Sequence, residues 1–242
     1  MPLWHGGVAD YGGSLSVRGR NGITPTSISG LQVWFDSDHA ASFTFGVSPK
    51  ISQWNDRSSN ARHVTQGFAG DQPSRNQTYG ARTAVRFSGV ANVQMFATAV
   101  TLAQPYTILA VAARSGGAVG QHVVIGNNGN TSAYLGIGNN ALVSIYAGTT
   151  VITQGSAPSV DQLQQVTGIF NGASSQAWGN GTAGTAGDAG TAAFELSCVG
   201  GLNLTSNHLA GDIAEIVVYN TALSDSNRIA IQNYLKAKWG TP

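Results

Sequence analysis

Two aspartates close together in the sequence are the acidic pair best placed to do chemistry. Asp36 and Asp38 occupy alternate positions, so on a strand both side chains would point to the same face. Glycoside hydrolysis needs such a pair of carboxylates. This pair has no third acidic neighbour, and the 5 histidines show no zinc spacing. A G-x-S-x-G motif is also missing from the sequence. We therefore predict that the chain is not an enzyme.

Aromatic side chains beside asparagines are the candidates for saccharide binding. A sugar stacks its apolar face on an aromatic ring and forms hydrogen bonds through its hydroxyl groups. The candidate residues form two sets, Tyr134 with Asn127 and Asn128, and Trp178 with Asn180. The alternative interpretation is that Trp178 packs in a sheet while Asn180 and the glycine after it close a hairpin.

The charge balance argues against a nucleic-acid partner. The chain of 242 residues carries 12 Lys and Arg against 11 Asp and Glu, a net charge of +1, and the basic residues form no run. Proteins that bind nucleic acids through phosphate contacts need a basic excess. The sequence predicts a neutral polar surface on which copies of the chain could pack as a homo-oligomer.

The sequence gives no sign of export, membrane insertion or disulfide bonding. Residues 1–10 lack a basic segment followed by an apolar one, and no apolar run reaches the roughly 18 residues of a membrane span. Cys198 is the single cysteine, so it has no intrachain partner. We predict synthesis in the cytoplasm without a signal peptide.

Short apolar runs between turn residues predict an all-β fold. Their order and their Asn-Gly separators favour an antiparallel meander. Two runs, ILAVAA and IVVY, are apolar on both faces, which is typical of strands that are covered on both sides. The expected strands lie at 31–35, 84–88, 106–113, 122–126, 133–138, 142–147, 163–170 and 212–219.

A helix is predicted at 225–239. Ser224 is a suitable N-cap, and Ile231, Leu235 and Trp239 recur at the spacing of one helical face. Gly240 is suited to end the helix.

Several of these segments, in this order, resemble the concanavalin A-like, laminin-G-like domains of bacterial and phage structural proteins. The segments are GLQVWFDSDHA (30–40), ISQWNDRSSNARHVTQ (51–66), AVRFSG (84–89), YTILAVAA (106–113), QVTGIFNG (165–172), QAWGNGT (176–182) and LAGDIAEIVVYNTALSDSNRIAIQNYLKAKWG (209–240). The resemblance implies a jelly-roll sandwich of two antiparallel sheets over residues 30–242, with a short C-terminal helix.

The same resemblance implies an optional calcium site, because related lectin-like domains bind Ca²⁺ through Asp and Asn oxygens. The available ligands are Asp36, Asp38, Asn203 and Asp212. Such residues more commonly lie in turns, so the prediction is that the protein has no cofactor, with Ca²⁺ as the alternative.

Residues 1–29 are rich in glycine and lack periodicity, which predicts an extended N-terminal arm. Such an arm can attach to a partner by adding a strand or filling a groove. Its candidate anchors are Trp4, Tyr11, Leu15, Val17 and Ile23.

Two functions follow from these features. The first is a virion structural protein, a phage capsid decoration, head-fibre or tail component, whose arm binds the major capsid protein or tail proteins. Its location would be the virion, and its sandwich could add weak adhesion to cell-surface glycans. The alternative is a lectin-like, carbohydrate-binding module of a bacterial protein.

Overall fold

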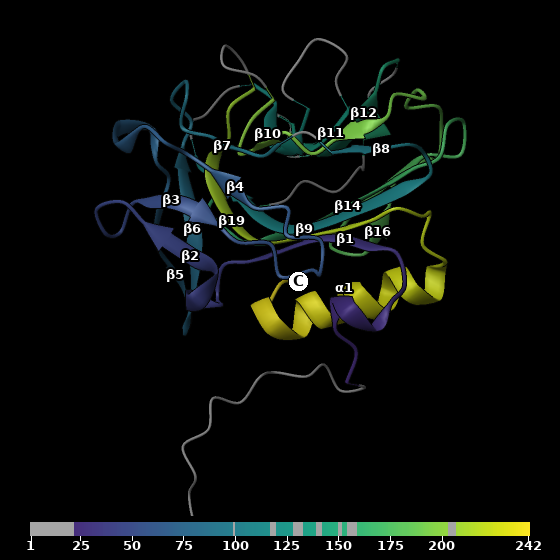
Figure 1. Ribbon diagram of the computed structural model, residues 1–242. Helices are drawn as coiled ribbons and strands as arrows, with labels where there is room; N and C mark the ends of the chain where they lie inside the picture. The colour runs from purple at the N-terminus through teal and green to yellow at the C-terminus, as the bar shows by residue number, and fades with distance from the viewer. Residues whose placement is uncertain are drawn as a thin grey trace, which may run out of the picture.

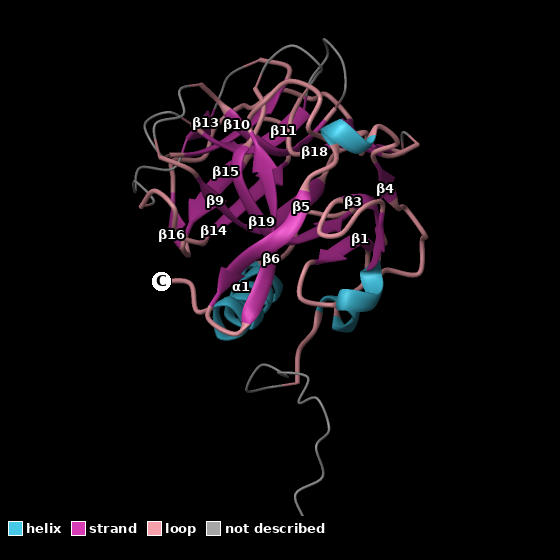
Figure 2. Cartoon of the chain, turned by 90° about the vertical axis from the view of Figure 1, so that its left-hand side faces the viewer, coloured by secondary structure: helices cyan, strands magenta, loops and turns pink. Residues whose placement is uncertain are grey.

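The computed structural model of the chain is built mainly from antiparallel strands. It describes residues 22–98, 100–116, 120–127, 133–138, 142–149, 152–153, 159–202 and 207–242. Strands dominate these ranges, and one long helix, α1, packs at one side of them (Figure 2). The predicted all-β sandwich with a C-terminal helix is therefore confirmed.

The first sheet has eight strands in the order β16-β15-β14-β9-β19-β6-β5, and β1 also pairs with β19. Their bounds are β1 (Leu31–Asp36), β5 (Ser74–Tyr79), β6 (Arg82–Ser88), β9 (Tyr106–Arg114), β14 (Gln164–Phe170), β15 (Gln176–Gly179), β16 (Thr182–Ala183) and β19 (Ala210–Tyr219).

The second sheet has nine strands in the order β13-β12-β11-β10-β18-β7-β4-β3-β2. Their bounds are β2 (Phe43–Phe45), β3 (Ile51–Trp54), β4 (Val64–Thr65), β7 (Met95–Phe96), β10 (His122–Gly126), β11 (Ala133–Ile137), β12 (Val143–Ala147), β13 (Ile152–Thr153) and β18 (Cys198–Val199). A separate two-stranded sheet joins β8 (Thr101–Leu102) to β17 (Phe194–Glu195).

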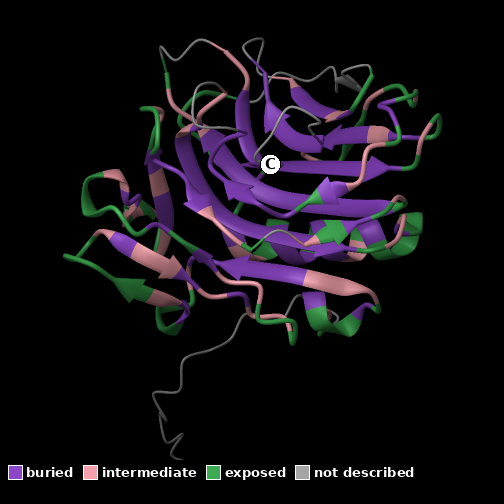
Figure 3. Ribbon diagram, turned by 45° about the horizontal axis from the view of Figure 1, so that its top comes forward, coloured by how far each residue is buried: buried purple, intermediate pink, exposed green. Residues whose placement is uncertain are grey.

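The two large sheets and α1 lie in three layers, with the eight-stranded sheet in the middle (Figure 1). Strand β9 shows how the sequence produces this order, because successive side chains of a strand point to opposite faces. Ile108 and Ala110 lie in the core between the sheets. Leu109 and Val111 lie in the second core, against α1. Both faces of the middle sheet are buried, as the apolar run ILAVAA predicts. Figure 3 shows the middle strands coloured mostly as buried.

Helix α1 covers Asp225–Trp239, the bounds that the sequence predicts. The Ser224 hydroxyl accepts a hydrogen bond from the backbone nitrogen of Asn227, and Gly240 ends the helix with a left-handed φ of 65°. The other helices are single 3-10 turns, η1 (Pro25–Ser27), η2 (Ala40–Ser42) and η3 (Ala69–Asp71). Within the described ranges, no helix has both the length and the apolar character to cross a membrane.

The end of the expected arm belongs to the sandwich. Ile23 packs against the core between the eight-stranded sheet and α1, and Ile28 is buried in that core. The Tyr219 hydroxyl donates a hydrogen bond of 2.9 Å to the Pro25 carbonyl. Residues 22–29 therefore lie on the domain, and Ile23 is a packing residue of this chain. The other expected anchors, Trp4, Tyr11, Leu15 and Val17, lie outside the described residues.

Candidate functional site

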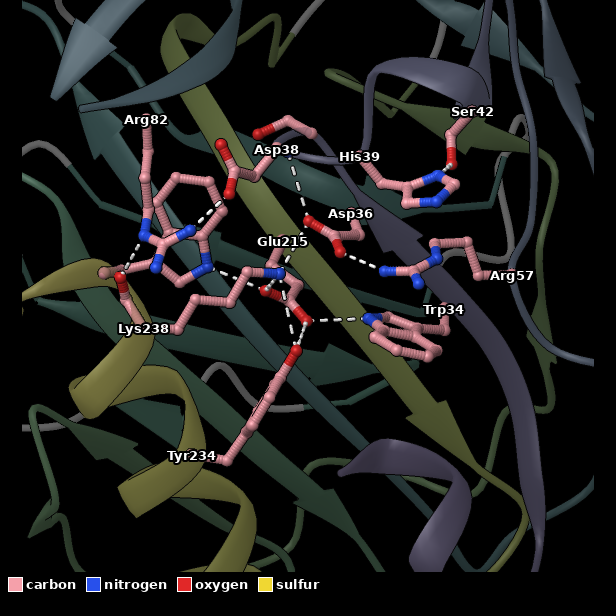
Figure 4. A network of polar contacts seen from close by, with 12 residues as sticks. Trp34, Asp36, Asp38, His39, Ser42, Arg57, Arg82, Glu215, Tyr234 and Lys238 are labelled. Carbon is pink, nitrogen blue, oxygen red and sulfur yellow. Dashed lines mark hydrogen bonds and ion pairs between the residues drawn. The ribbon is translucent and has the colours of Figure 1, made fainter. Parts of the chain in front are cut away.

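A network of polar side chains surrounds Glu215, which lies on β19 and contacts α1 (Figure 4). Its side chain is fully buried. One carboxylate oxygen accepts hydrogen bonds from Trp34 Nε1 at 2.6 Å and from the Tyr234 hydroxyl at 2.9 Å. The other accepts from Trp239 Nε1 at 2.7 Å and pairs with Lys238 Nζ at 2.8 Å. Both oxygens therefore have partners within the protein.

Asp36 lies opposite Glu215 in the β1–β19 ladder and shares its cation. Lys238 Nζ lies 2.6 Å from Asp36 Oδ1, and Arg57 pairs with the other oxygen. Burial raises the pKa of Glu215, and the charge of Lys238 opposes that shift. Asp36 is 3% exposed and Glu215 is not exposed. Because a substrate cannot reach either group, we assign the pair to the attachment of α1.

The residues proposed for calcium are occupied by other interactions. The three aspartates proposed for calcium each pair with an arginine, in the pairs Asp36–Arg57, Asp38–Arg82 and Asp212–Arg86. Asn203 lies outside the described residues. In the part of the chain that the structure describes, no group of three or more His, Cys, Asp or Glu side chains is placed to hold a metal ion.

The first set of predicted saccharide residues lies in the nine-stranded sheet. Tyr134 is buried, with its ring stacked on Tyr146 at 5.6 Å between centroids. Asn127 is buried too, and its Oδ1 accepts a hydrogen bond of 2.7 Å from the Glu195 backbone. Asn128 lies outside the described residues. Tyr134 therefore packs against Tyr146, and Asn127 holds the backbone at Glu195.

The second set lies in the eight-stranded sheet. Trp178 is buried, and the guanidinium of Arg228 covers its ring at 4.5 Å. Asn180 has a left-handed φ of 49°, and its Oδ1 accepts a hydrogen bond of 2.9 Å from the Gln165 backbone. This geometry agrees with the alternative interpretation, in which Trp178 packs and Asn180 closes a hairpin. The two predicted sets lie in different sheets and form no common site.

A pocket of about 600 Å³ opens at another place, where β4 and β7 pair in the nine-stranded sheet. These strands lie in the upper left of Figure 1. One side of the pocket is the segment that runs from β4 through η3, and the other is the segment that leads into β7. Its lining includes Thr65, Gln66, Phe68, Asp71, Asn92 and Phe96.

Two aromatic side chains give the pocket an apolar surface. Phe68, just before η3, is 78% exposed, and Phe96 on β7 is half-buried. A phenylalanine gains free energy from burial, so one that lies almost fully in solvent beside a pocket is a candidate contact for a ligand.

A buried amide fixes the two sides of the pocket relative to each other. Gln66 Nε2 donates to the backbone carbonyls of Asn92 at 3.0 Å and Gln94 at 2.8 Å. Gln66 Oε1 accepts from the Phe68 backbone at 3.1 Å. The Gln72 side chain donates to the Gln66 carbonyl at 3.0 Å. The pocket is therefore preformed, with Gln66 as its positioning residue.

Two polar side chains in the lining have no partner in the described protein. The half-buried Asp71 is held through its backbone nitrogen, which donates to the Phe68 carbonyl at 3.0 Å. Within the described residues, neither the Asp71 carboxylate nor the side-chain amide of the exposed Asn92 forms a hydrogen bond or ion pair. An acceptor and a mixed donor and acceptor are thus available to a ligand.

This pocket is not among the sites that the sequence predicts. Its available signal is QGFAGDQ (66–72), a phenylalanine among glycines and polar residues, where no strand would bury the ring. The contribution of Asn92 and Phe96 has no local signal, because it follows from the pairing of β4 with β7.

Comparisons with known proteins identify the fold and no family. No protein-family model matches the sequence, and no curated protein matches it. A sialidase from Trypanosoma rangeli in complex with sialic acid matches at a TM-score of 0.55 and 13% identity, over 86% of this chain and 33% of that chain. Domain 4 of a GH43 extracellular arabinanase from Geobacillus stearothermophilus, in complex with arabinotriose, matches at a TM-score of 0.59 and 13% identity. That match covers 84% of this chain and 97% of the arabinanase domain.

These matches show that the chain has a β-sandwich fold. The chain spans about a third of the length of the sialidases that it matches. The prediction that the chain is not an enzyme is wrong. It rests on missing motifs, and the same fold occurs within sialidases and an arabinanase. None of the structures compared supports the virion, phage or capsid-decoration prediction.

Proposed function

We propose that this protein is a carbohydrate-binding domain and that the pocket between β4, η3 and β7 holds the saccharide. One observation carries the proposal. A preformed pocket of about 600 Å³ presents an exposed phenylalanine beside a carboxylate and an amide that have no partner in the described protein.

The residue types suit a sugar. A pyranose or furanose ring has apolar C–H faces that stack on aromatic rings, here Phe68 and Phe96. Its hydroxyl groups both donate and accept hydrogen bonds, and they match the carboxylate of Asp71 and the amide of Asn92. Because Gln66 already fixes the two sides, binding needs little ordering of the protein.

The fold supports the same class of function. The match covers 97% of the arabinanase domain, and the structure of that domain contains arabinotriose. That ligand belongs to the arabinanase domain, and the saccharide of this protein is to be found by experiment. Attachment to a virion, capsid or tail partners, homo-oligomer formation and calcium binding stay predictions from the sequence.

Substitution of Phe68 tests the proposal. We expect Phe68→Ala to weaken saccharide binding about tenfold, because it removes the stacking surface. Its stability should change by no more than about 0.5 kcal/mol, since the side chain is exposed. The measurement is binding to an array of neutral and acidic oligosaccharides, followed by calorimetric titration of the best ligand.

Phe45→Ala is the matched control, because Phe45 is a partly exposed phenylalanine, on β2, that does not line the pocket. It should bind like the unmodified protein. Equal binding by the Phe68 and Phe45 variants would reject the pocket, and an array with no bound saccharide would reject the function.

A further inference from the structure

The pocket carries charge of one sign. Among the described residues that line it, Asp71 is the only charged residue. We propose that the pocket selects neutral saccharides over anionic ones through the carboxylate of Asp71, an inference that rests on the proposed function.

The position of Asp71 makes its charge effective. The residue ends η3 and is half-buried, and its backbone is tied to Phe68 by a hydrogen bond. The carboxylate therefore lies in the same short segment as the proposed stacking surface. Neighbouring hydroxyl groups of a neutral sugar can donate to its two oxygens, and hydrogen bonds to a charged acceptor are strong ones. A carboxylate on the sugar would instead meet a like charge.

Two cations near this segment, Lys50 and Arg75, contact neutral groups, and neither forms an ion pair with Asp71 in the described protein. Lys50 Nζ donates to the Gln72 carbonyl at 2.9 Å. The guanidinium of Arg75 donates to the Ser37 carbonyl at 2.8 Å and lies over the Phe43 ring at 5.3 Å. Neither cation belongs to the pocket lining.

A second pocket shows the opposite character. It has a volume of about 260 Å³, lies beside α1, and includes Arg228 and Lys236 in its lining. Arg228 is already paired with Asp225 at 2.8 Å and donates to Gln232. An anionic sugar could still associate there, so the test must report binding at the first pocket alone.

Competition provides that test. The probe is the neutral oligosaccharide of glucose, galactose, mannose or arabinofuranose that binds best, carrying a fluorescent label. Its competitors are the unlabelled oligosaccharide, the same molecule oxidised at a terminal primary hydroxyl to the uronic acid, and the amide of that acid. The acid and the amide have nearly the same size and differ in charge.

We expect the uronic acid to compete roughly fivefold less well than its amide. Asp71→Asn should bring this ratio close to one, because it removes the charge and keeps the shape. Glu195→Gln is the matched control, since it removes an exposed carboxylate that does not line the pocket, and it should leave the ratio unchanged.

The outcomes separate the two proposals. An acid that competes as well as its amide, or a ratio that Asp71→Asn leaves unchanged, would overturn the charge selection and leave saccharide binding intact. If acidic oligosaccharides displace the probe better than neutral ones do, the selection is also overturned. If no saccharide of either class binds, the proposed function fails and this inference fails with it.

Discussion

Phe68 and Asp71 are two residues whose placement folding alone does not explain. An exposed phenylalanine gives up the free energy of its burial, and a half-buried carboxylate without a partner loses part of its hydration. Both lie in one short segment beside a pocket. Departures from the usual rules of placement concentrate at functional sites, so these two residues identify the site better than Trp178 does, which is buried.

Cys198, which does not line the pocket, provides a test of how well the core excludes water. Cys198 is fully buried, its thiol donates to Gln94 Oε1, and burial raises the pKa of that thiol to about 12 from an ordinary value of 9.0. Because the folded-state pKa is the higher one, this contribution to stability is complete below pH 9 and is lost as the pH rises toward 12.

Between pH 8 and pH 10, the unmodified protein should therefore lose about 1.4 kcal/mol more stability than Cys198→Ala does. Urea denaturation at the two pH values measures this, and titration of the tyrosines cancels in the comparison. Equal losses in both proteins would show that the thiol is accessible to water in the folded state.

Among the elements, helix α1 is attached by charge as well as by apolar packing. Its Lys238 is 8% exposed and lies between the carboxylates of Asp36 and Glu215. Removing one partner from a buried ion pair leaves uncompensated charge in the interior and typically costs about 3–5 kcal/mol. Here two buried carboxylates would lose the same cation.

We therefore expect Lys238→Met to destabilise the protein by about 3 kcal/mol, measured by chemical denaturation. Lys236→Met is the control on the same helix, where the side chain is exposed and a change within about 0.5 kcal/mol is expected. Similar midpoints for the two variants would mean that the network beneath α1 contributes little to stability.

At the scale of the whole molecule, the sequence predicts the architecture better than the site. Runs that are apolar on both faces predict a middle sheet with two covered faces, and the capping residues Ser224 and Gly240 predict the helix bounds. The predicted arm ends at residue 29, whereas in the structure Ile23 and Ile28 already pack in the core against α1. Two isolated apolar residues form no periodic pattern, so the sequence does not indicate this packing.

The site is harder to predict because it depends on contacts between distant segments. Nothing near Trp178 in the sequence indicates that Arg228 covers its ring. The pocket joins residues 65–71 to residues 92–96 through β4 and β7, strands of two residues each, which are too short to show an alternating pattern.

The most direct test of saccharide binding is to map it along the whole chain. ¹⁵N-labelled protein would be titrated with the oligosaccharide that binds best, and the shift of each backbone amide recorded. We predict that the largest shifts fall within residues 65–71 and 92–96, which line the pocket. Largest shifts around Tyr134 or Trp178, or no shifts at saturating saccharide, would contradict the assignment of this pocket as the binding site.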